Sequence, residues 1–248
     1  MKLLLDVGNT AVKWATAESG SLTARGAFGY RDGEFGRLAN QAWSGIETPA
    51  VVVAVNVAGE GVAASIADYV SEAWQCPVEL IKTARSACGV TNAYRAPGDL
   101  GADRWVAMIA AHHRVDGAVC IVDCGTAITI DLVAASGEHR GGLILPGVRL
   151  LGETLAVNTA GIRLQDDTTA TGLLGRTTRD GVTGGAQYLV AAAIDRIAAD
   201  VVEDAGEPVT VIITGGDAER LLPLLATPVQ HEPRLVLQGL AILSDKGN

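Results

Sequence analysis

The chain has 248 residues, of which 48% are hydrophobic and 19% are charged, and its formal net charge is −9. This composition is too apolar for a disordered chain and too rich in glycine for a coiled coil, and the length allows one large domain or two small ones. The 19 basic residues are scattered rather than gathered in a stripe, so we expect no nucleic-acid partner.

Apolar segments and cysteines predict a cytoplasmic protein without a membrane partner. The apolar run at residues 3–5 ends at Asp6, far short of the apolar core of a signal peptide. No segment reaches the roughly 18 apolar residues that a membrane span needs. The four cysteines form no CxxC pair and the four histidines no zinc motif, which indicates reduced, buried thiols rather than disulfides or a zinc site.

The first half of the chain predicts a three-stranded meander followed by alternating helices and strands. Extended apolar runs at residues 3–5, 11–15 and 21–28 are separated by turns that contain glycine. After them we expect a strand at 50–55, a helix at 61–74, a strand at 78–81 and a helix at 101–114. The boundary of a first domain is expected near residue 116.

The second half repeats this pattern. The segment from Asp123 to Gly137 aligns without a gap with the segment from Asp6 to Gly20, at an offset of 117 residues. Strands are expected at 120–122, 128–133 and 139–145, then a helix at 187–202, a strand at 209–214 and a helix at 218–225. The sequence therefore predicts an α/β protein with two tandem domains, residues 1–116 and 117–248, each a mixed β-sheet flanked by helices.

An Asp-x-Gly motif follows the first strand of each half, beginning at Asp6 and at Asp123. A glycine there lets backbone approach a ligand, and successive N–H groups form an anion-binding concavity. Asn9, Thr10 and Thr126 can donate hydrogen bonds to phosphate oxygens, and the Asp6 carboxylate can hold a hydrated Mg²⁺. The alternative is a plain strand–turn–strand in which these residues only form the turn. Two copies favour a pair of facing loops that clamp the phosphates of a nucleotide.

A second polar cluster, Gly101-Ala102-Asp103-Arg104-Trp105, opens the expected helix at 101–114. One interpretation makes Asp103 a general base and Arg104 an anchor for an anionic or polar substrate. The other makes the cluster an ordinary helix N-terminus, where the helix dipole favours an acidic side chain.

Three further glycine motifs have alternatives of their own. Residues 140–147 end a strand and open a helix; there they form only a turn or let backbone approach a ligand. Residues 214–217, between a strand and a helix, would let backbone lie against a phosphate or an adenosine, and residues 175–180 are typical of a helix cap. Gly59, Gly61 and Ala64 fit the GxGxxA pattern of a dinucleotide-binding oxidoreductase, although three residues separate the first glycine from the preceding strand. The absence of a Gly-Lys dipeptide excludes a P-loop.

Taken together, the motifs resemble the type III pantothenate kinases, which belong to the superfold of acetate and sugar kinases, heat-shock chaperones and actin. The resemblance is carried, in order and spacing, by Asp6-Val7-Gly8-Asn9-Thr10, residues 101–105, residues 123–131, residues 141–147, Thr178-Arg179-Asp180 and Thr214-Gly215-Gly216. It implies two tandem duplicated ribonuclease H-like (actin-like ATPase) domains. It also implies ATP-dependent phosphorylation of pantothenate to 4′-phosphopantothenate, the first step of coenzyme A biosynthesis.

The resemblance assigns roles to individual residues. Asp103 is the implied proton acceptor, and Asp123 the implied ligand of a monovalent cation, K⁺ or NH₄⁺. Pantothenate contacts are implied for Tyr94, Gly101, Ala102, Asp103, Arg104 and Thr178. ATP contacts are implied for Asp6, Val7, Gly8, Asn9, Thr10, Ala11, Val12, Lys13 and Thr126, with Mg²⁺ held by Asp6 through water. A homodimer whose substrate pocket involves the subunit interface is also implied; a non-catalytic accessory protein of the same fold is the remaining alternative.

Overall fold

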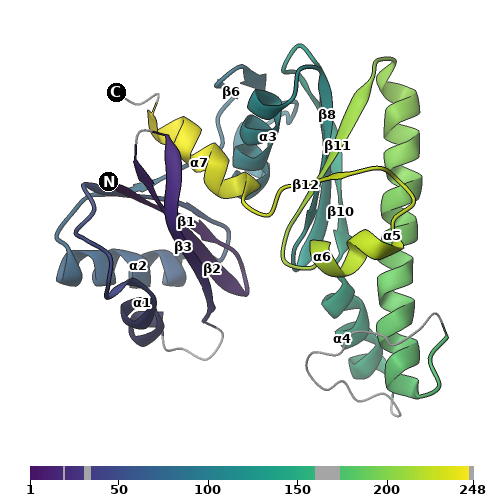
Figure 1. Ribbon diagram of the computed structural model, residues 1–248, viewed down its shortest axis with the longest axis horizontal. Coiled ribbons are helices and arrows are strands. Elements are labelled where there is room, and N and C mark those ends of the chain that lie inside the picture. Colours follow the sequence, from purple (N-terminus) through teal and green to yellow (C-terminus); the bar gives the residue numbers. More distant parts are fainter. Residues whose placement is uncertain (19, 31–34, 160–173, 246–248) are drawn as a thin grey trace. The chain divides into compact units, whose positions relative to one another are not determined.

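Two five-stranded mixed sheets, each flanked by helices, make up the protein (Figure 1). The structure, a computed structural model, describes residues 1–18, 20–30, 35–159 and 174–245. The chain divides into unit 1, Met1–Arg114 with Arg234–Asn248, and unit 2, Val115–Pro233. The α/β class with two mixed sheets, predicted from the sequence, is confirmed.

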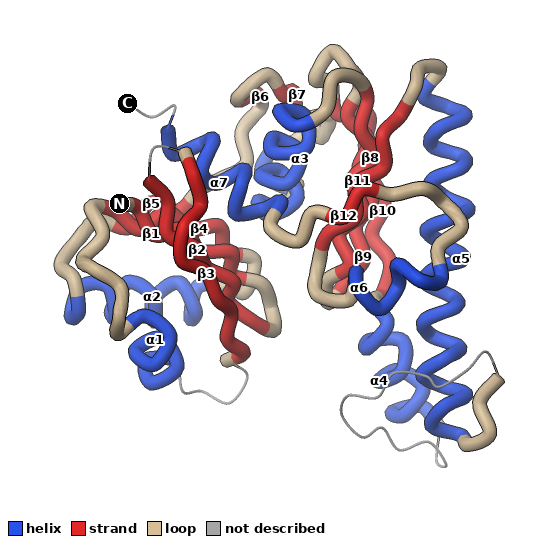
Figure 2. The backbone as a smooth tube through the Cα atoms, in the orientation of Figure 1, coloured by secondary structure: helices blue, strands red, loops and turns tan. Residues whose placement is uncertain are grey.

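The sheet of unit 1 has the strand order β3-β2-β1-β4-β5 (Figure 2). The first three strands form the expected antiparallel meander, and β4 and β5 continue the sheet in parallel from β1. The apolar runs that predict strands become its centre, because β1 and β4 are buried almost throughout. The strands are β1 (Lys2–Val7), β2 (Ala11–Glu18), β3 (Ser21–Gly29), β4 (Val51–Asn56) and β5 (Val78–Leu80).

Helices lie on both faces of this sheet (Figure 2). Helices α1 (Phe35–Trp43) and α2 (Glu60–Ala73) pack on one face around Trp43 and Ile66. Helices α3 (Ala102–Arg114) and α7 (Leu235–Asp245) pack against each other and against the opposite side of β1 and β4. A short hairpin, β6 (Ser86–Ala87) and β7 (Val90–Thr91), and a 3₁₀ turn at Pro97–Asp99 lead into α3.

Unit 2 repeats the topology of unit 1. Its strand order is β10-β9-β8-β11-β12, with antiparallel and parallel neighbours in the same places. The strands are β8 (Ala118–Cys124), β9 (Ala127–Val133), β10 (His139–Pro146), β11 (Val209–Thr214) and β12 (Gln230–His231). The helices are α4 (Val148–Asn158), α5 (Thr178–Ala205) and α6 (Ala218–Leu221), which a 3₁₀ turn at Leu222–Leu224 follows.

Two features differ from the sequence expectation. Helix α7 packs in unit 1, although the sequence placed residues 117–248 together; at the crossing, a Cβ on Gly239 would lie only 2.1 Å from the Val106 carbonyl oxygen, so glycine permits this approach. The repeat also needs a gap after its first turn, because Asp6 faces Lys13 whereas Asp123 faces Thr129. The second loop is therefore one residue shorter. Ser19, one of the repeated residues, lies outside the described residues.

Some helices and strands differ from the boundaries that the sequence predicts, or were not predicted. Helix α5 begins at Thr178, nine residues before the expected position, because the Thr177 hydroxyl caps it by accepting the Asp180 N–H at 3.1 Å. The sequence did not predict α1, α7, the β6–β7 hairpin or β12. Among the described residues, no helix is long and apolar enough to cross a membrane.

Candidate active site

The loop after β1 is fixed from three directions. The Gly8 N–H donates to the Ala11 carbonyl at 3.1 Å and closes the turn. The Tyr30 hydroxyl donates to the Gly8 carbonyl. The Val57 N–H, just past β4, donates to the Val7 carbonyl at 3.0 Å. The loop shape is therefore set by backbone groups and by one tyrosine from the end of the meander.

The residues expected to bind ATP in the first half lie in this single β1–β2 hairpin. Asp6 stands opposite Lys13 of β2 and beside Val55 of β4. Directly opposed residues project to the same face of a sheet, so a carboxylate and an ammonium group share one face near the loop. Asn9 is exposed and Thr10 half-buried, and both side chains carry donors of the kind that bind an anionic ligand.

The corresponding loop after β8 is held by the glycine motifs around it. The Asp217 N–H donates to the Cys124 carbonyl at 2.9 Å, and the Gly147 N–H donates to the Thr126 carbonyl at 3.1 Å. A Cβ on Gly215, whose φ is +98°, would lie 2.4 Å from the Cys124 carbonyl, and one on Gly147 would lie 2.5 Å from the Thr126 oxygen. These two glycines therefore approach the loop backbone, whereas the sequence interpretation gave such glycines a ligand to approach.

Asp123 lies in a row of oxygen-bearing side chains. It stands opposite Thr129 of β9 and beside Thr214 of β11, so the three residues share one face of the sheet. Among residues 1–18, 20–30, 35–159 and 174–245, no group of three His, Cys, Asp or Glu side chains gathers as a metal site. The row thus offers one carboxylate and two hydroxyl oxygens, and oxygen donors of this kind suit hard cations better than a zinc ion.

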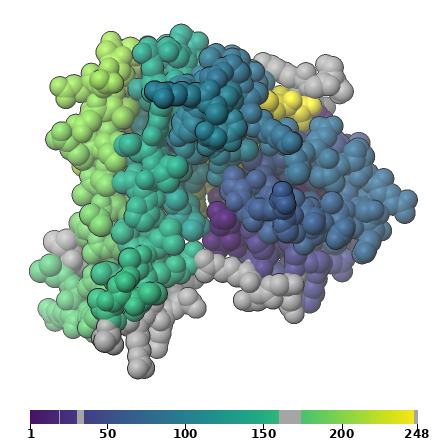
Figure 3. Space-filling model, turned by 180° about the vertical axis from the view of Figure 1, so that it is seen from behind, coloured from purple at the N-terminus to yellow at the C-terminus, as the bar shows by residue number. Residues whose placement is uncertain are grey.

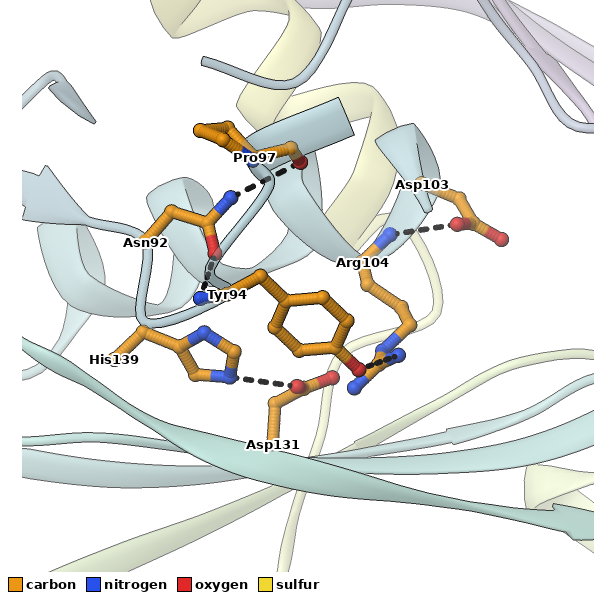
Figure 4. Close-up of polar contacts among 7 residues, drawn as sticks. All are labelled: Asn92, Tyr94, Pro97, Asp103, Arg104, Asp131 and His139. Atoms are coloured by element: carbon orange, nitrogen blue, oxygen red, sulfur yellow. Dashed lines mark hydrogen bonds and ion pairs between the residues drawn. The ribbon is translucent and has the colours of Figure 1, made fainter. Parts of the chain in front are cut away.

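A buried histidine–aspartate pair on the same face escaped the sequence analysis. His139 Nε2 lies 3.0 Å from Asp131 Oδ1, and the two residues are 0% and 2% exposed (Figure 4). Burial, with the Asp131 carboxylate as a second cause, raises the pKa of the Cys120 thiol to about 12. Burial first, and then nearby carboxylates, also raise the pKa of Cys124. Both thiols are therefore protonated at neutral pH, which fits their expected structural role.

Asp103 occupies the first turn of α3 and is half-buried. Its Oδ1 accepts the N–H of Arg104 at 2.8 Å, and a Cβ on Gly101 would lie 2.6 Å from the same oxygen. Only a glycine leaves this carboxylate undisturbed, and Ala102 then begins the helix. Asp103 thus lies at a helix N-terminus, as the structural interpretation of the cluster expects. It is also partly exposed, as its interpretation as a general base requires.

Arg104 and Tyr94, two of the expected substrate contacts, meet directly. Arg104 is 6% exposed, and its Nη1 donates to the Tyr94 hydroxyl at 3.0 Å (Figure 4). The guanidinium carbon also lies 5.6 Å from the centre of the Tyr94 ring. The guanidinium group presents a rigid fork of N–H donors, a geometry that suits a carboxylate or phosphate group of a ligand. Asn92, which holds the Tyr94 loop, was also missed, although an Asn two residues before Tyr94 is a turn signal.

Within unit 2, Thr178 lies away from the other expected site residues, Asp123 and Thr126. It is the exposed first residue of α5, the helix that packs against α4 (Figure 1). Twelve residues, about 18 Å of helix, separate it from Val190, where α5 joins the core on the sheet. Within unit 2, the structure therefore does not bring Thr178 to the loop of Asp123 and Thr126.

The GxGxxA residues of the alternative interpretation form a local turn. Gly59 precedes α2 with a φ of +94°. The Asn56 side chain closes the turn by accepting the Ala58 N–H and donating to the Gly59 carbonyl, both at 2.9 Å. An Asx turn explains the motif without a dinucleotide.

Comparisons with known proteins match the part of the chain that contains both Asp-x-Gly loops and helix α3. A family model for type III pantothenate kinase matches residues 2–200. Type III pantothenate kinases of Nitrosococcus oceani and Alkalilimnicola ehrlichii are 40% and 36% identical, over 97% and 98% of this chain and 92% and 97% of theirs.

Solved structures show the same fold at low sequence identity. A putative Baf family transcriptional activator from Campylobacter jejuni has a TM-score of 0.56 at 17% identity, covering 99% of this chain and 100% of its own. A putative 2-dehydro-3-deoxygalactonokinase from Sinorhizobium meliloti has a TM-score of 0.58 at 14% identity, covering 99% of both chains. Because the family model spans both Asp-x-Gly loops and the helix of Asp103, and the relatives match nearly end to end, the chain belongs to the type III pantothenate kinase family.

Proposed function

We propose that this chain transfers the γ-phosphoryl group of ATP to the 4′-hydroxyl of pantothenate and yields 4′-phosphopantothenate, in the first step of coenzyme A biosynthesis. The observation that carries the proposal is the half-buried Asp103 carboxylate on the first turn of α3, next to the buried Arg104–Tyr94 pair. Phosphoryl transfer depends on positioning and charge neutralisation, and this arrangement supplies a base and a fixed cation. Family membership replaces the dinucleotide-binding alternative with a kinase.

Asp103 acts on the acceptor hydroxyl. As the oxygen–phosphorus bond forms and the bond to ADP breaks, the hydroxyl proton passes to the Asp103 carboxylate. Pantothenate carries a carboxylate, which suits the Arg104 guanidinium, and hydroxyl groups, which suit the Tyr94 phenol and the backbone of Gly101 and Ala102. Thr178 is the remaining proposed contact.

The two Asp-x-Gly loops bind ATP in this proposal. Residues 6–13 and Thr126 contact the nucleotide, and Asp6 holds Mg²⁺ through water, as is common for an ion bound mainly by phosphates. Asp123 holds K⁺ or NH₄⁺, and its neighbours Thr129 and Thr214 provide oxygen atoms of the appropriate kind. A divalent ion neutralises charge on the transferring group.

We also propose a homodimer. Helix α5 exposes a stripe of small and apolar residues, with Gly185 and Ala192 on either side of Tyr188 and Leu189, which are 40% and 58% exposed. The light green residues of α5 cover one side of unit 2 in Figure 3. A second copy that covers this stripe would shield apolar surface, and the exposed Thr178 on the same helix would serve a site shared between copies. A cytoplasmic location stays a prediction of the sequence.

An ADP-release assay with ATP, pantothenate, Mg²⁺ and K⁺ tests the proposal, and ADP formation should depend on pantothenate. Asp103→Asn keeps the oxygen that accepts the Arg104 N–H but removes the base. We expect kcat to fall by a factor of about 10² or more, with the affinities for ATP and pantothenate largely intact.

Two results would count against the proposal. A kcat of the variant near that of the wild type would remove Asp103 from the role of base. No ADP formation with any of a panel of hydroxylated substrates would instead favour a non-catalytic accessory protein.

A further inference from the structure

The loop that carries Tyr94 is held by one buried side chain, that of Asn92, which is 2% exposed. Its Oδ1 accepts the Tyr94 N–H at 2.9 Å, and its Nδ2 donates to the Pro97 carbonyl at 3.2 Å (Figure 4). The same Nδ2 also donates to the Ala84 carbonyl at 3.4 Å. A carboxamide provides an acceptor and two donors on one planar group. Neither a carboxylate nor an apolar side chain can make all three bonds.

These bonds join Tyr94 to the start of α3. The Pro97 carbonyl, which accepts from Asn92, also accepts the Leu100 N–H at 3.2 Å in the 3₁₀ turn that leads into the helix. From the helix, Arg104 reaches back to the Tyr94 hydroxyl at 3.0 Å. The Asn92 carboxamide thus links the Tyr94 loop to the turn before α3, and these contacts fix the position of the Tyr94 hydroxyl relative to the Arg104 guanidinium.

A second side chain supports the loop from outside. The Arg85 guanidinium donates to the carbonyls of Asn92, Tyr94 and Arg95 at 3.0, 2.8 and 2.8 Å. Arg85 is exposed, so water can replace its bonds when it is removed. The Asn92 carboxamide is itself buried, so water replaces its bonds less readily, and Asn92 is the stronger of these two supports of the Tyr94 loop.

We propose that Asn92 is a positioning residue for pantothenate: its carboxamide holds the Tyr94 hydroxyl within reach of Arg104 and so prepares the pair that receives the substrate. The inference rests on the proposed function. Asn92 acts through Tyr94 and has no part in the transfer step itself. Its loss therefore affects pantothenate binding, while ATP binding in the β1–β2 hairpin stays as it is.

Steady-state kinetics and calorimetry on Asn92→Ala test this role. We expect KM and Kd for pantothenate to rise about tenfold, as the loss of one well-placed polar contact does, and KM for ATP to change less than about twofold. Asn92→Ser keeps an acceptor two residues before Tyr94, so its affinity for pantothenate should lie between wild type and Asn92→Ala. If Asn92→Ala does not fold, Asn92→Ser takes its place in every comparison.

A double-variant cycle with Tyr94→Ala separates positioning from mere stability. If Asn92 works through Tyr94, the double variant should bind pantothenate no more weakly than the weaker single variant. Thr16→Val is the matched control: Thr16 is 3% exposed in β2 and accepts the Ala24 N–H at 2.9 Å, so its replacement lowers stability but leaves KM for pantothenate unchanged.

Three results would overturn the inference while leaving the proposed function intact. They are an unchanged pantothenate affinity in an active Asn92 variant, an equal loss of affinity for ATP, and multiplying effects in the double variant. A wild-type protein without pantothenate-dependent ADP formation refutes the proposed function instead.

Discussion

Gly215 offers a sharp test of how the loop after β8 is held. A methyl group at this position would lie 2.4 Å from the Cys124 carbonyl group, whereas ordinary contact begins at 3.4 Å, so the two segments must separate by 1.0 Å in Gly215→Ala. Overpacking of this kind costs about 1–3 kcal/mol. The backbone φ of +98° adds about 1–2 kcal/mol for a residue with a Cβ.

Together the two terms predict a loss of about 2–5 kcal/mol, which lowers Tm by roughly 4–20 °C in a chain of this size. The neighbouring Gly216 is the control, because a Cβ there meets nothing within 4 Å and its φ is not positive. Gly216→Ala should therefore keep its stability within about 0.5 kcal/mol. Thermal unfolding followed by circular dichroism measures both variants.

The same perturbation has a functional consequence. Separation of Gly215 from Cys124 displaces the loop that carries Thr126, so KM for ATP should rise in Gly215→Ala more than KM for pantothenate. Equal Tm values for the two glycine variants would refute the packing argument. A lower Tm with an unchanged KM for ATP would show that the loop position does not govern nucleotide binding.

Two further predictions concern the first loop and the buried thiols. Tyr30→Phe removes the bond to the Gly8 carbonyl, so initial-rate kinetics should show a KM for ATP raised about 2- to 10-fold; an unchanged KM would mean that the turn holds its shape without the phenol. Because the pKa of Cys120 is raised to about 12 and that of Cys124 is also raised, the thiolate is scarce even at about pH 9. Iodoacetamide should therefore leave both unmodified in the folded protein at about pH 7 and about pH 9; their labelling before unfolding, read by mass spectrometry, would contradict their burial.

Several features of this protein followed from the sequence alone, because they depend on local patterns. Continuous apolar runs, broken by glycine turns, predicted both meanders and the strands at 50–55 and 209–214, which the structure places as β4 and β11. The repeated Asp-x-Gly motif predicted the duplicated topology, since a similar local pattern builds a hairpin at the same place in each half. The Asp103 cluster was correctly placed at the start of a helix.

Other features depended on contacts between distant segments. No local signal places α7 with unit 1; the close approach of Gly239 to Val106 decides it. The Asn92 carboxamide is an ordinary turn former in sequence, and only the fold shows that it also reaches Pro97 and Ala84. Hydrogen bonds from one side chain to several segments produce no periodic pattern and no motif in the amino-acid sequence, so they cannot be predicted from it.

The glycine motifs and Thr178 show most clearly which features the sequence determines and which the tertiary structure decides. The glycine motifs at residues 140–147 and 214–217 indicated places where backbone can approach a neighbour or a ligand, because glycine permits close contact. Only the tertiary structure decided that the neighbour is the loop of Cys124 and Thr126. In the same way, residues 175–180 indicated a helix cap, but only the 28-residue helix α5 shows how far Thr178 lies from the core of unit 2. Sequence patterns specify local conformation, whereas the partners of each segment are chosen by packing over the whole chain.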